Sequence, residues 1–144
     1  MEIIFSNEAP QRAAAYALRQ AVFVEERGIA AELEFDDKDT DERLYAVAYS
    51  EKRLPLATLR LEPQAQQVMR FGRICTRKAY RGQGLGRQLL MAAEAWAIAH
   101  GAKQAQIDGE LTAQGFYEHC GYHVTAGPFE EAGAPVVVLR KTLI

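Results

Sequence analysis

The chain has 144 residues, of which 49% are apolar and 25% charged, with a formal net charge of -2. This length can bury a core of its own, and the near-balanced charge gives no compositional case for disorder or for a nucleic-acid-binding surface. No apolar run approaches the roughly 20 residues that span a bilayer, and the start, MEIIFSNEAPQR, lacks the pattern of a signal peptide. We therefore expect one cytoplasmic domain over residues 1–144, with no membrane segment.

The first forty residues predict a strand, a helix and an exposed loop. EIIF at 2–5 is a short strand, and Pro10 suits the first turn of a helix whose apolar face includes Leu18 and Val22. We expect that helix to end near Gly28. The segment ELEFDDKDTDE at 32–42 holds seven carboxylates and one lysine, and this self-repelling composition predicts an exposed loop.

The remainder of the chain predicts more strands than helices. Three β-rich runs, LYAVAYSE, LPLATLRLEP and QVMRFGRICT, are separated by short polar turns, which favours an antiparallel meander. A helix from Leu85 to Gly101, a strand AKQAQID, a short helix capped by Thr112 and ended by Gly121, and a final strand APVVVLRKTL follow. This order predicts a mixed α/β or α+β sheet with helices on its faces.

A glycine-rich stretch, AYRGQGLGRQLL at 79–90, lies between a predicted strand and a predicted helix. Free backbone N–H groups and the positive end of a helix dipole meet at such a turn, and they suit a phosphate. No Lys-Ser or Lys-Thr follows the last glycine, and the spacing G-x-G-x-G differs from the dinucleotide fingerprint. On these residues alone, a tight turn that binds nothing is an equally open interpretation.

The turn and two further segments of the chain resemble motifs of one family. RGQGLG at 81–86 matches the R/Q-x-x-G-x-G/A signature of the GNAT (Gcn5-related N-acetyltransferase) superfamily, and AQGFYEHCGY at 113–122 is similar to its A-x-x-F-Y-x-x-x-G-F/Y element. VFVEERGIAAELEFDDKD at 22–39 resembles a bacterial branch described as ElaA-like or YjcF-like. The resemblance covers nearly the whole chain. It implies the GNAT fold: six to seven mostly antiparallel strands with a parallel, splayed central pair, and about four helices.

The resemblance implies acetyl-CoA as cosubstrate and direct acetyl transfer to an amine. Tyr117 matches the tyrosine that donates a proton to the leaving sulfur; a phenol with an ordinary pKa near 10 is protonated at neutral pH, as this role requires. The other interpretation of Tyr117 is a tyrosine that only packs near a helix start. The residues expected to bind the cosubstrate are Ile74, Cys75, Thr76, Arg81, Gly82, Gln83, Gly84, Leu85, Gly86, Arg87, Phe116 and Tyr117.

The general base stays open at this stage. Gly72 stands on the central strand where related sequences of this branch can have a glutamate. Asp108 and Glu110, at the end of the next strand, are the candidates for a base or a water relay. Each of them is also compatible with an ordinary solvated carboxylate.

The acceptor side is expected, by resemblance, to include Phe23, Glu26, Glu34 and Arg73. Arg73 lies within a strand, where an unpaired guanidinium would be costly if buried, so we expect it to have a carboxylate partner. That partner belongs either to the fold, as part of the acidic loop, or to an anionic acceptor. The negative charge of the acidic loop also suggests a cationic acceptor, although an ordinary solvated surface loop explains the same composition.

Metal and thiol chemistry are disfavoured. A calcium loop from Asp37 lacks the glycine and the final glutamate that it needs, and His119, Cys120 and His123 lack the spacing of a zinc site. We therefore expect no metal. A covalent acetyl-Cys75 route lacks an evident activating histidine, and we expect no disulfide between Cys75 and Cys120.

The sequence thus predicts an acetyl-CoA-dependent N-acetyltransferase that acts on a primary amine of a small molecule or peptide in a ternary complex. A non-catalytic acyl-CoA-binding sensor is the main alternative, and a nucleotide-binding switch is a third. The expected partners are acetyl-CoA and an amine acceptor, without nucleic acid or membrane; a homodimer stays open.

Overall fold

The computed structural model describes residues 1–144, and it contains seven strands and four α-helices. The strands are β1 (Glu2–Ser6), β2 (Leu44–Tyr49), β3 (Pro55–Pro63), β4 (Val68–Thr76), β5 (Gln104–Glu110), β6 (His123–Glu131) and β7 (Ala134–Thr142). The helices are α1 (Ala9–Arg19), α2 (Ala31–Glu34), α3 (Leu85–Ala99) and α4 (Gln114–His119), with a π-helix η1 (Gln20–Glu26) and 3-10 turns η2 (Lys78–Tyr80) and η3 (Leu111–Ala113). No helix is long and apolar enough to cross a membrane.

The strands form one sheet in the order β1-β2-β3-β4-β5-β7-β6. The pairs β1–β2, β2–β3, β5–β7 and β6–β7 are antiparallel, whereas β4 and β5 are parallel, with Val68 opposite Gln104 and Phe71 opposite Ile107. This confirms the predicted mixed sheet with a parallel central pair. The chain folds as two compact units, Met1–Glu62 with Arg73–Ala93, and Pro63–Gly72 with Glu94–Ile144.

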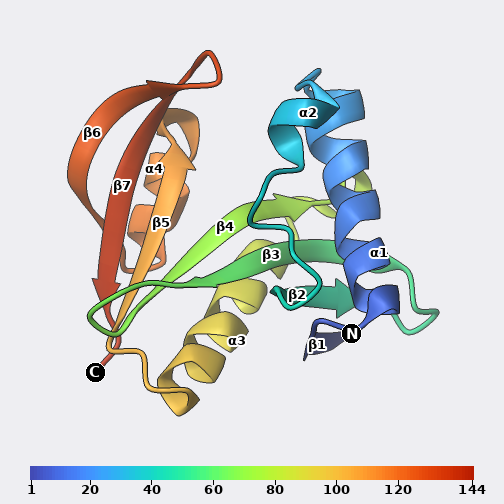
Figure 1. Cartoon of the computed structure of the whole chain (residues 1–144), viewed down its shortest axis with the longest axis horizontal. Helices are drawn as coiled ribbons and strands as arrows, with labels where there is room; N and C mark the ends of the chain where they lie inside the picture. Colours follow the sequence, from blue (N-terminus) through green and yellow to red (C-terminus); the bar gives the residue numbers. More distant parts are fainter. The chain divides into compact units, whose positions relative to one another are not determined.

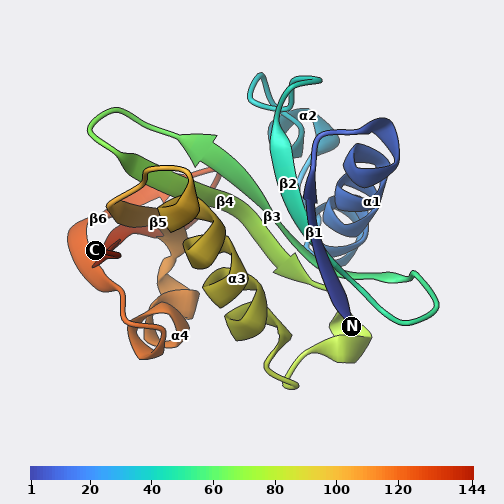
Figure 2. The same ribbon diagram turned by 90° about the horizontal axis from the view of Figure 1, so that it is seen from below.

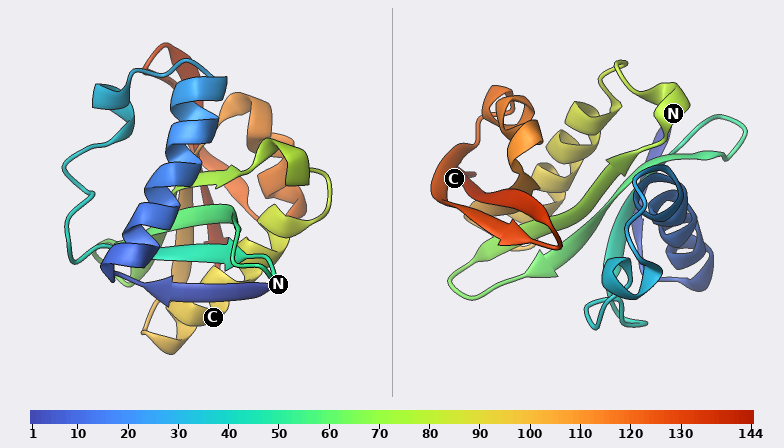
Figure 3. Two further views of the ribbon diagram at one scale, coloured as in Figure 1. Left: turned by 90° about the vertical axis from the view of Figure 1, so that its right-hand side faces the viewer. Right: turned by 90° about the horizontal axis from the view of Figure 1, so that it is seen from above.

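The first unit is built around strands β1, β2 and β3. Strands β1 and β2 run side by side, and α1 crosses one face of these strands (Figures 2 and 3). The apolar side of α1 and η1 packs there because its residues recur at helical spacing. The buried cluster that results consists of Ala15, Leu18, Val22, Tyr45, Val47, Tyr49 and Cys75.

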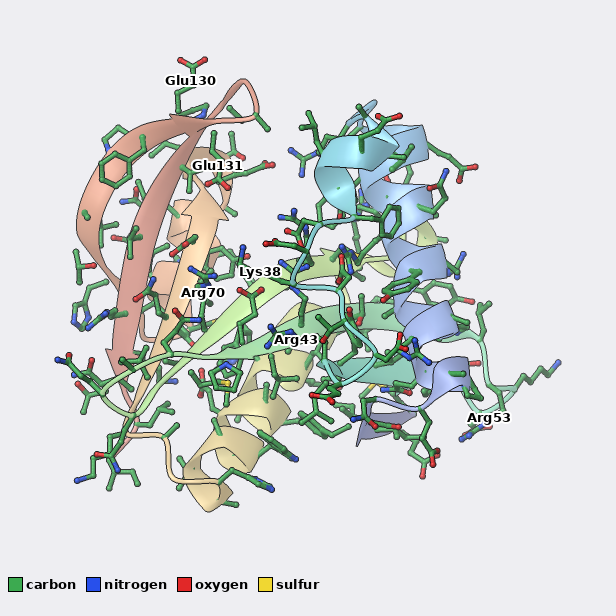
Figure 4. The ribbon with its side chains drawn as sticks, viewed as in Figure 1. Lys38, Arg43, Arg53, Arg70, Glu130 and Glu131 are labelled. Atoms are coloured by element: carbon green, nitrogen blue, oxygen red, sulfur yellow. The ribbon has the colours of Figure 1, made fainter.

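The second unit pairs β5, β7 and β6, and α4 lies against β5 (Figure 1). Because side chains alternate along a strand, Ala105, Ile107 and Gly109 are buried on one face of β5, while Gln104, Gln106 and Asp108 belong to the other. The β6–β7 hairpin carries Glu130 and Glu131 at its tip (Figure 4).

The first helical segment ends near Gly28, as predicted, since η1 ends at Glu26 and Gly28 has φ of +74°. It is not one α-helix throughout, because α1 ends at Arg19 and continues as the π-helix η1, at whose end Arg27 donates a backbone hydrogen bond to Val22 five residues earlier, at 3.2 Å. Seven residues are too few for an apolar pattern to separate the two helix types. Thr112 caps nothing: it lies inside η3, and α4 begins at Gln114 without a side-chain cap.

The strand β6 was missing from the sequence-based element order. It is an edge strand that contains Gly127 and Pro128, residues that weaken a strand signal, and most of its side chains are exposed. The predicted helix-ending glycines Gly101 and Gly121 are confirmed, with φ of +93° and +96°.

Candidate active site

The glycine-rich turn lies between β4 and α3, as predicted, and the 3-10 turn η2, which was not predicted, precedes its first glycine. Gly82 and Gly84 have φ of +78° and +80°, a backbone conformation that side-chain-bearing residues rarely adopt. No other atom lies within 4 Å of where a Cβ would stand at either residue. The glycines are therefore required by the backbone rather than by crowding, and the space beside the turn is open.

The start of α3 supplies the electrostatics of an anion site. Its first amides have no partner within the helix, and the helix dipole adds partial positive charge at Leu85. Gln83 and Arg87 are exposed beside them, whereas Leu85 and Gly86 are half-buried. The turn therefore offers main-chain donors and an accessible cation to a phosphate.

Arg81 is bound to a residue that the sequence placed on the acceptor side. Its Nη1 and Nη2 donate to the two carboxylate oxygens of Glu26 at 2.7 and 2.8 Å, and its Nε donates to the Thr76 carbonyl at 2.9 Å. These hydrogen bonds lower the pKa of the Glu26 carboxyl group. The pair thus ties the end of the π-helix to the strand and turn that are expected to hold the cosubstrate.

Strand β4 carries the other residues expected near the acetyl group. Ile74 and Thr76 are half-buried, and Cys75 packs into the core of the first unit. Burial raises the pKa of the Cys75 thiol to about 12. The thiolate is therefore scarce at neutral pH, which argues against a covalent route through this cysteine.

Arg73 has the carboxylate partners that the sequence predicted. Its Nε lies 3.2 Å from Glu34 Oε2, and its Nη2 lies 3.1 Å from Asp36 Oδ2. Both partners belong to the acidic segment, so the fold itself supplies them. Arg73 also has φ of +51°, an irregularity within β4.

The acidic segment is only in part the exposed loop that the sequence predicted: Glu32, Asp37, Asp41 and Glu42 are exposed, whereas its other three carboxylates are bound by arginines. Glu34 is 3% exposed and accepts a hydrogen bond from Arg19 Nε at 2.9 Å, while Asp39 accepts bonds from both Nη atoms of Arg19 at 2.7 and 2.8 Å. Arg60 Nη1 reaches Asp36 and Asp39 at 2.9 and 3.0 Å. Carboxylates that would repel one another in a free loop are thus neutralised by arginines from α1, β3 and β4.

We call this set the buried charge cluster, and it consists of Arg19, Glu34, Asp36, Asp39, Arg60, Glu62 and Arg73. Burial alone would raise the pKa of Asp39, but hydrogen bonds from Arg19 and Tyr45 outweigh it and hold that pKa well below its usual value. Sequence reasoning missed the cluster, although arginines inside an apolar helix face and an apolar strand were its signal.

Arg43 directly follows the acidic segment in the sequence. Its side chain donates hydrogen bonds to the Lys38 carbonyl at 2.8 Å and to the Leu61 carbonyl at 3.1 Å (Figure 4). These bonds connect the acidic segment to β3. Phe23, expected on the acceptor side, is half-buried against the core of the first unit, with the Arg27 guanidinium 5.7 Å from its ring centre.

Tyr117 lies in the second unit and is 8% exposed. Its ring makes edge-to-face contacts with Phe116 and Tyr122, at centroid distances of 5.4 and 6.4 Å. Phe116 itself is exposed. The two expected cosubstrate residues of α4 therefore differ in exposure: the Tyr117 ring is buried and the Phe116 ring is exposed.

The candidate bases belong to the other face of β5. Asp108 accepts a hydrogen bond from Gln106 at 3.0 Å and lies 3.5 Å from Arg70 Nη1; Arg70 projects from β4 (Figure 4). Glu110 follows two residues later on the same face and is half-buried. The Tyr117 ring packs on the Gly109 face, so the strand separates the tyrosine from both carboxylates.

The residues considered for metal binding are not gathered into a site. No group of three or more His, Cys, Asp or Glu side chains could hold a metal ion. The ring Nδ1 of His119 lies 2.7 Å from the Gly115 carbonyl, within its own helix. Cys75 and Cys120 are both free thiols.

Comparisons with known proteins show the family of this chain. The profile of the Acetyltransferase (GNAT) family matches residues 12–122. A candidate acetyltransferase from Bacillus subtilis (strain 168) is 34% identical over 129 residues, which cover 88% of this chain and 86% of that protein.

Two solved structures share the fold over nearly the full length. A candidate N-acetyltransferase from Lactobacillus plantarum is 67% identical, with a TM-score of 0.97 over 99% of this chain and 98% of that chain. Escherichia coli ElaA has a TM-score of 0.85 at 22% identity, over 98% of this chain and 99% of that chain.

Proposed function

Since this chain belongs to the GNAT family of acetyltransferases, we propose that it transfers the acetyl group of acetyl-CoA to a primary amine of a small molecule or peptide. The open glycine turn at the start of α3 carries this proposal. Gly82 and Gly84 hold the left-handed conformation that exposes main-chain donors, and Arg81 adds a guanidinium next to them. A pyrophosphate is the anionic part of the cosubstrate that fits such donors.

The proposed reaction needs one proton acceptor and one proton donor. A protonated amine has no lone pair, and its usual pKa of about 10.4 means that a base or a water relay must first remove a proton. The amine nitrogen then attacks the acetyl carbon, the carbon–sulfur bond breaks, and the sulfur leaves with the electron pair. We assign protonation of that thiolate to the Tyr117 hydroxyl group, and the second proton, which the nitrogen loses as the amide forms, converts the tyrosinate back to the phenol.

Asp108 and Glu110 are the proposed acceptors of the amine proton, directly or through water. They belong to the face of β5 opposite the Tyr117 ring, which would keep the proton-accepting and proton-donating groups apart. Glu26 and Glu34 suit this role less well, because arginines hold both carboxylates at 2.7–2.9 Å, whereas the contact of Asp108 with Arg70 is longer, at 3.5 Å.

Thiol release from acetyl-CoA across a panel of amines tests the proposal. We expect Tyr117→Phe to lower kcat by about 10²-fold or more, with little change in the Kd for acetyl-CoA, because the phenol acts only when the thiolate forms. An unchanged kcat would remove Tyr117 from the mechanism.

The sensor and the nucleotide switch make different predictions in the same experiments. Tight acetyl-CoA binding without turnover on any amine would favour a non-catalytic acyl-CoA-binding protein. A nucleotide switch requires that ATP or GTP raise the melting temperature at least as much as CoA does. We expect CoA to stabilise the protein more than either nucleotide.

A further inference from the structure

Gly109 occupies the last core-facing position of β5, where the pattern of the strand calls for a side chain. The preceding residues on that face, Ala105 and Ile107, are 0% and 1% exposed. A strand interior is weakened by glycine, so a buried glycine at this place needs a local cause.

The cause is the ring of Tyr117. A Cβ on Gly109 would stand 2.7 Å from Tyr117 Cε2 and 3.1 Å from Cδ2, closer than packed carbon atoms approach. Cε2 is bonded to the carbon that bears the hydroxyl group. The missing side chain therefore determines how closely the hydroxyl-bearing edge of the ring approaches β5.

Helix α4 cannot easily move away to relieve such a contact, because its C-terminal end is anchored. Tyr122 donates its backbone N–H to the Tyr117 carbonyl at 3.1 Å, and its hydroxyl donates to Glu94 Oε2 at 2.8 Å. Lys141 Nζ donates to the other Glu94 oxygen and to the Cys120 carbonyl, both at 2.9 Å. Tyr122 and Glu94 are buried, so these bonds are shielded from water.

We propose that Gly109 is a positioning residue that sets the place of the Tyr117 hydroxyl group. The effect on turnover rests on the proposed function of Tyr117 as proton donor, whereas the packing contact does not. A methyl group at residue 109 has to rotate or displace the ring, since the anchored end of α4 holds the backbone of Tyr117.

Gly109→Ala tests the proposal, with Gly115→Ala as the matched control. Gly115 lies in the same helix as Tyr117, is exposed, and has no atom within 4 Å of an added Cβ. We expect Gly109→Ala to lower kcat by about 10- to 100-fold, with less than about a twofold change in the Kd for acetyl-CoA. Gly115→Ala should leave both values near those of the unchanged protein.

Two tyrosine backgrounds separate the ring from the hydroxyl group. In the Tyr117→Phe background the hydroxyl is absent, so Gly109→Ala should cause no further loss of kcat. If Gly109→Ala lowers kcat by the same factor with and without the Tyr117 hydroxyl group, the proposal is overturned, because the substitution would then act on turnover through some other group.

The melting temperature tests the contact without any turnover. Gly109→Ala should lower Tm by roughly 3–10 °C in the unchanged protein and in the Tyr117→Phe background, where the ring remains. In the Tyr117→Ala background this loss should vanish; an equal loss there would overturn the proposal. If no amine supports turnover, the proposed function fails. The melting temperatures still show whether residue 109 determines the position of the Tyr117 ring.

Discussion

The acidic segment (residues 32–42) and the glycine-rich turn (residues 81–87) both look like polar connections in the sequence, yet their arginine-bound carboxylates differ in exposure to water. Glu34 and Asp39 of the acidic segment are withdrawn from water and bound to Arg19, which is fully buried. Arg81 and Glu26 stay 40% and 30% exposed, at the edge of an open turn. Charges that hold the fold are thus buried in a network, whereas the charges that we propose to lie beside a ligand remain accessible.

The strongest way to break this contrast is to remove Arg19. Arg19→Met leaves two carboxylates buried without their main cation, and we expect a loss of about 3–5 kcal/mol in the free energy of unfolding, or failure to fold. Denaturant unfolding measures it. The matched control is Arg53→Met: Arg53 pairs with Glu2 at 2.6 Å with both side chains 63% exposed, and its loss should cost less than about 1 kcal/mol (Figure 4). If the two variants lost similar amounts of unfolding free energy, the assigned difference between the buried pairs of Arg19 and the exposed pair of Arg53 would be wrong.

Acid should weaken the same cluster through Asp39. Its pKa is lower in the folded protein than the unfolded value near 3.8, so its stabilising contribution is complete above that value and is lost as the pH falls through the folded pKa. We expect Asp39→Asn to lose about 2–3 kcal/mol at pH 7. The gap to the unchanged protein should narrow below about pH 4 in urea unfolding series; a gap that is independent of pH would show that the Asp39 charge is not the cause.

Local sequence patterns predicted most elements, without β6, and the turn, but apart from Arg73 they did not predict the partners of the buried charges. Strand alternation, helix periodicity and the glycines of residues 82 and 84 are local signals, and the structure matches them. The pairing of Arg19 with Asp39, and of Arg60 with Asp36, joins residues from separate elements that only the tertiary structure brings together. A run of carboxylates alone does not reveal whether its counter-charges lie in solvent or in the core.

The contacts of the candidate site, too, could be predicted from the sequence only in part. The partner of Arg73 could be expected as a carboxylate because a guanidinium inside a strand demands one, and Glu34 and Asp36 supply it. The bond between Arg81 and Glu26 was not expected, since the two residues were assigned to different substrates. Likewise, no local sequence signal indicated that Gly109 leaves room for the Tyr117 ring, because that contact depends on how α4 packs against β5.

The exposed pair offers the smallest and most selective effect. Arg81→Ala should leave the melting temperature within about 2 °C, because an exposed ion pair contributes less than about 1 kcal/mol. It should nevertheless raise the Kd and the KM for acetyl-CoA about two- to fivefold, with a smaller change in kcat, since we propose that the guanidinium contacts the pyrophosphate and takes no part in the chemical step. Isothermal titration calorimetry with CoA measures the effect on binding affinity without an amine acceptor.

Glu26→Gln shows which way the pair works. Arg81 uses three of its five N–H groups on Thr76 and Glu26, so two remain for an anion while Glu26 holds the guanidinium in place. On this view Glu26→Gln weakens CoA binding slightly, and adding it to Arg81→Ala changes nothing further. If Glu26→Gln tightens CoA binding instead, the carboxylate competes with the phosphates for Arg81, and the turn would have to release Glu26 each time a cosubstrate binds.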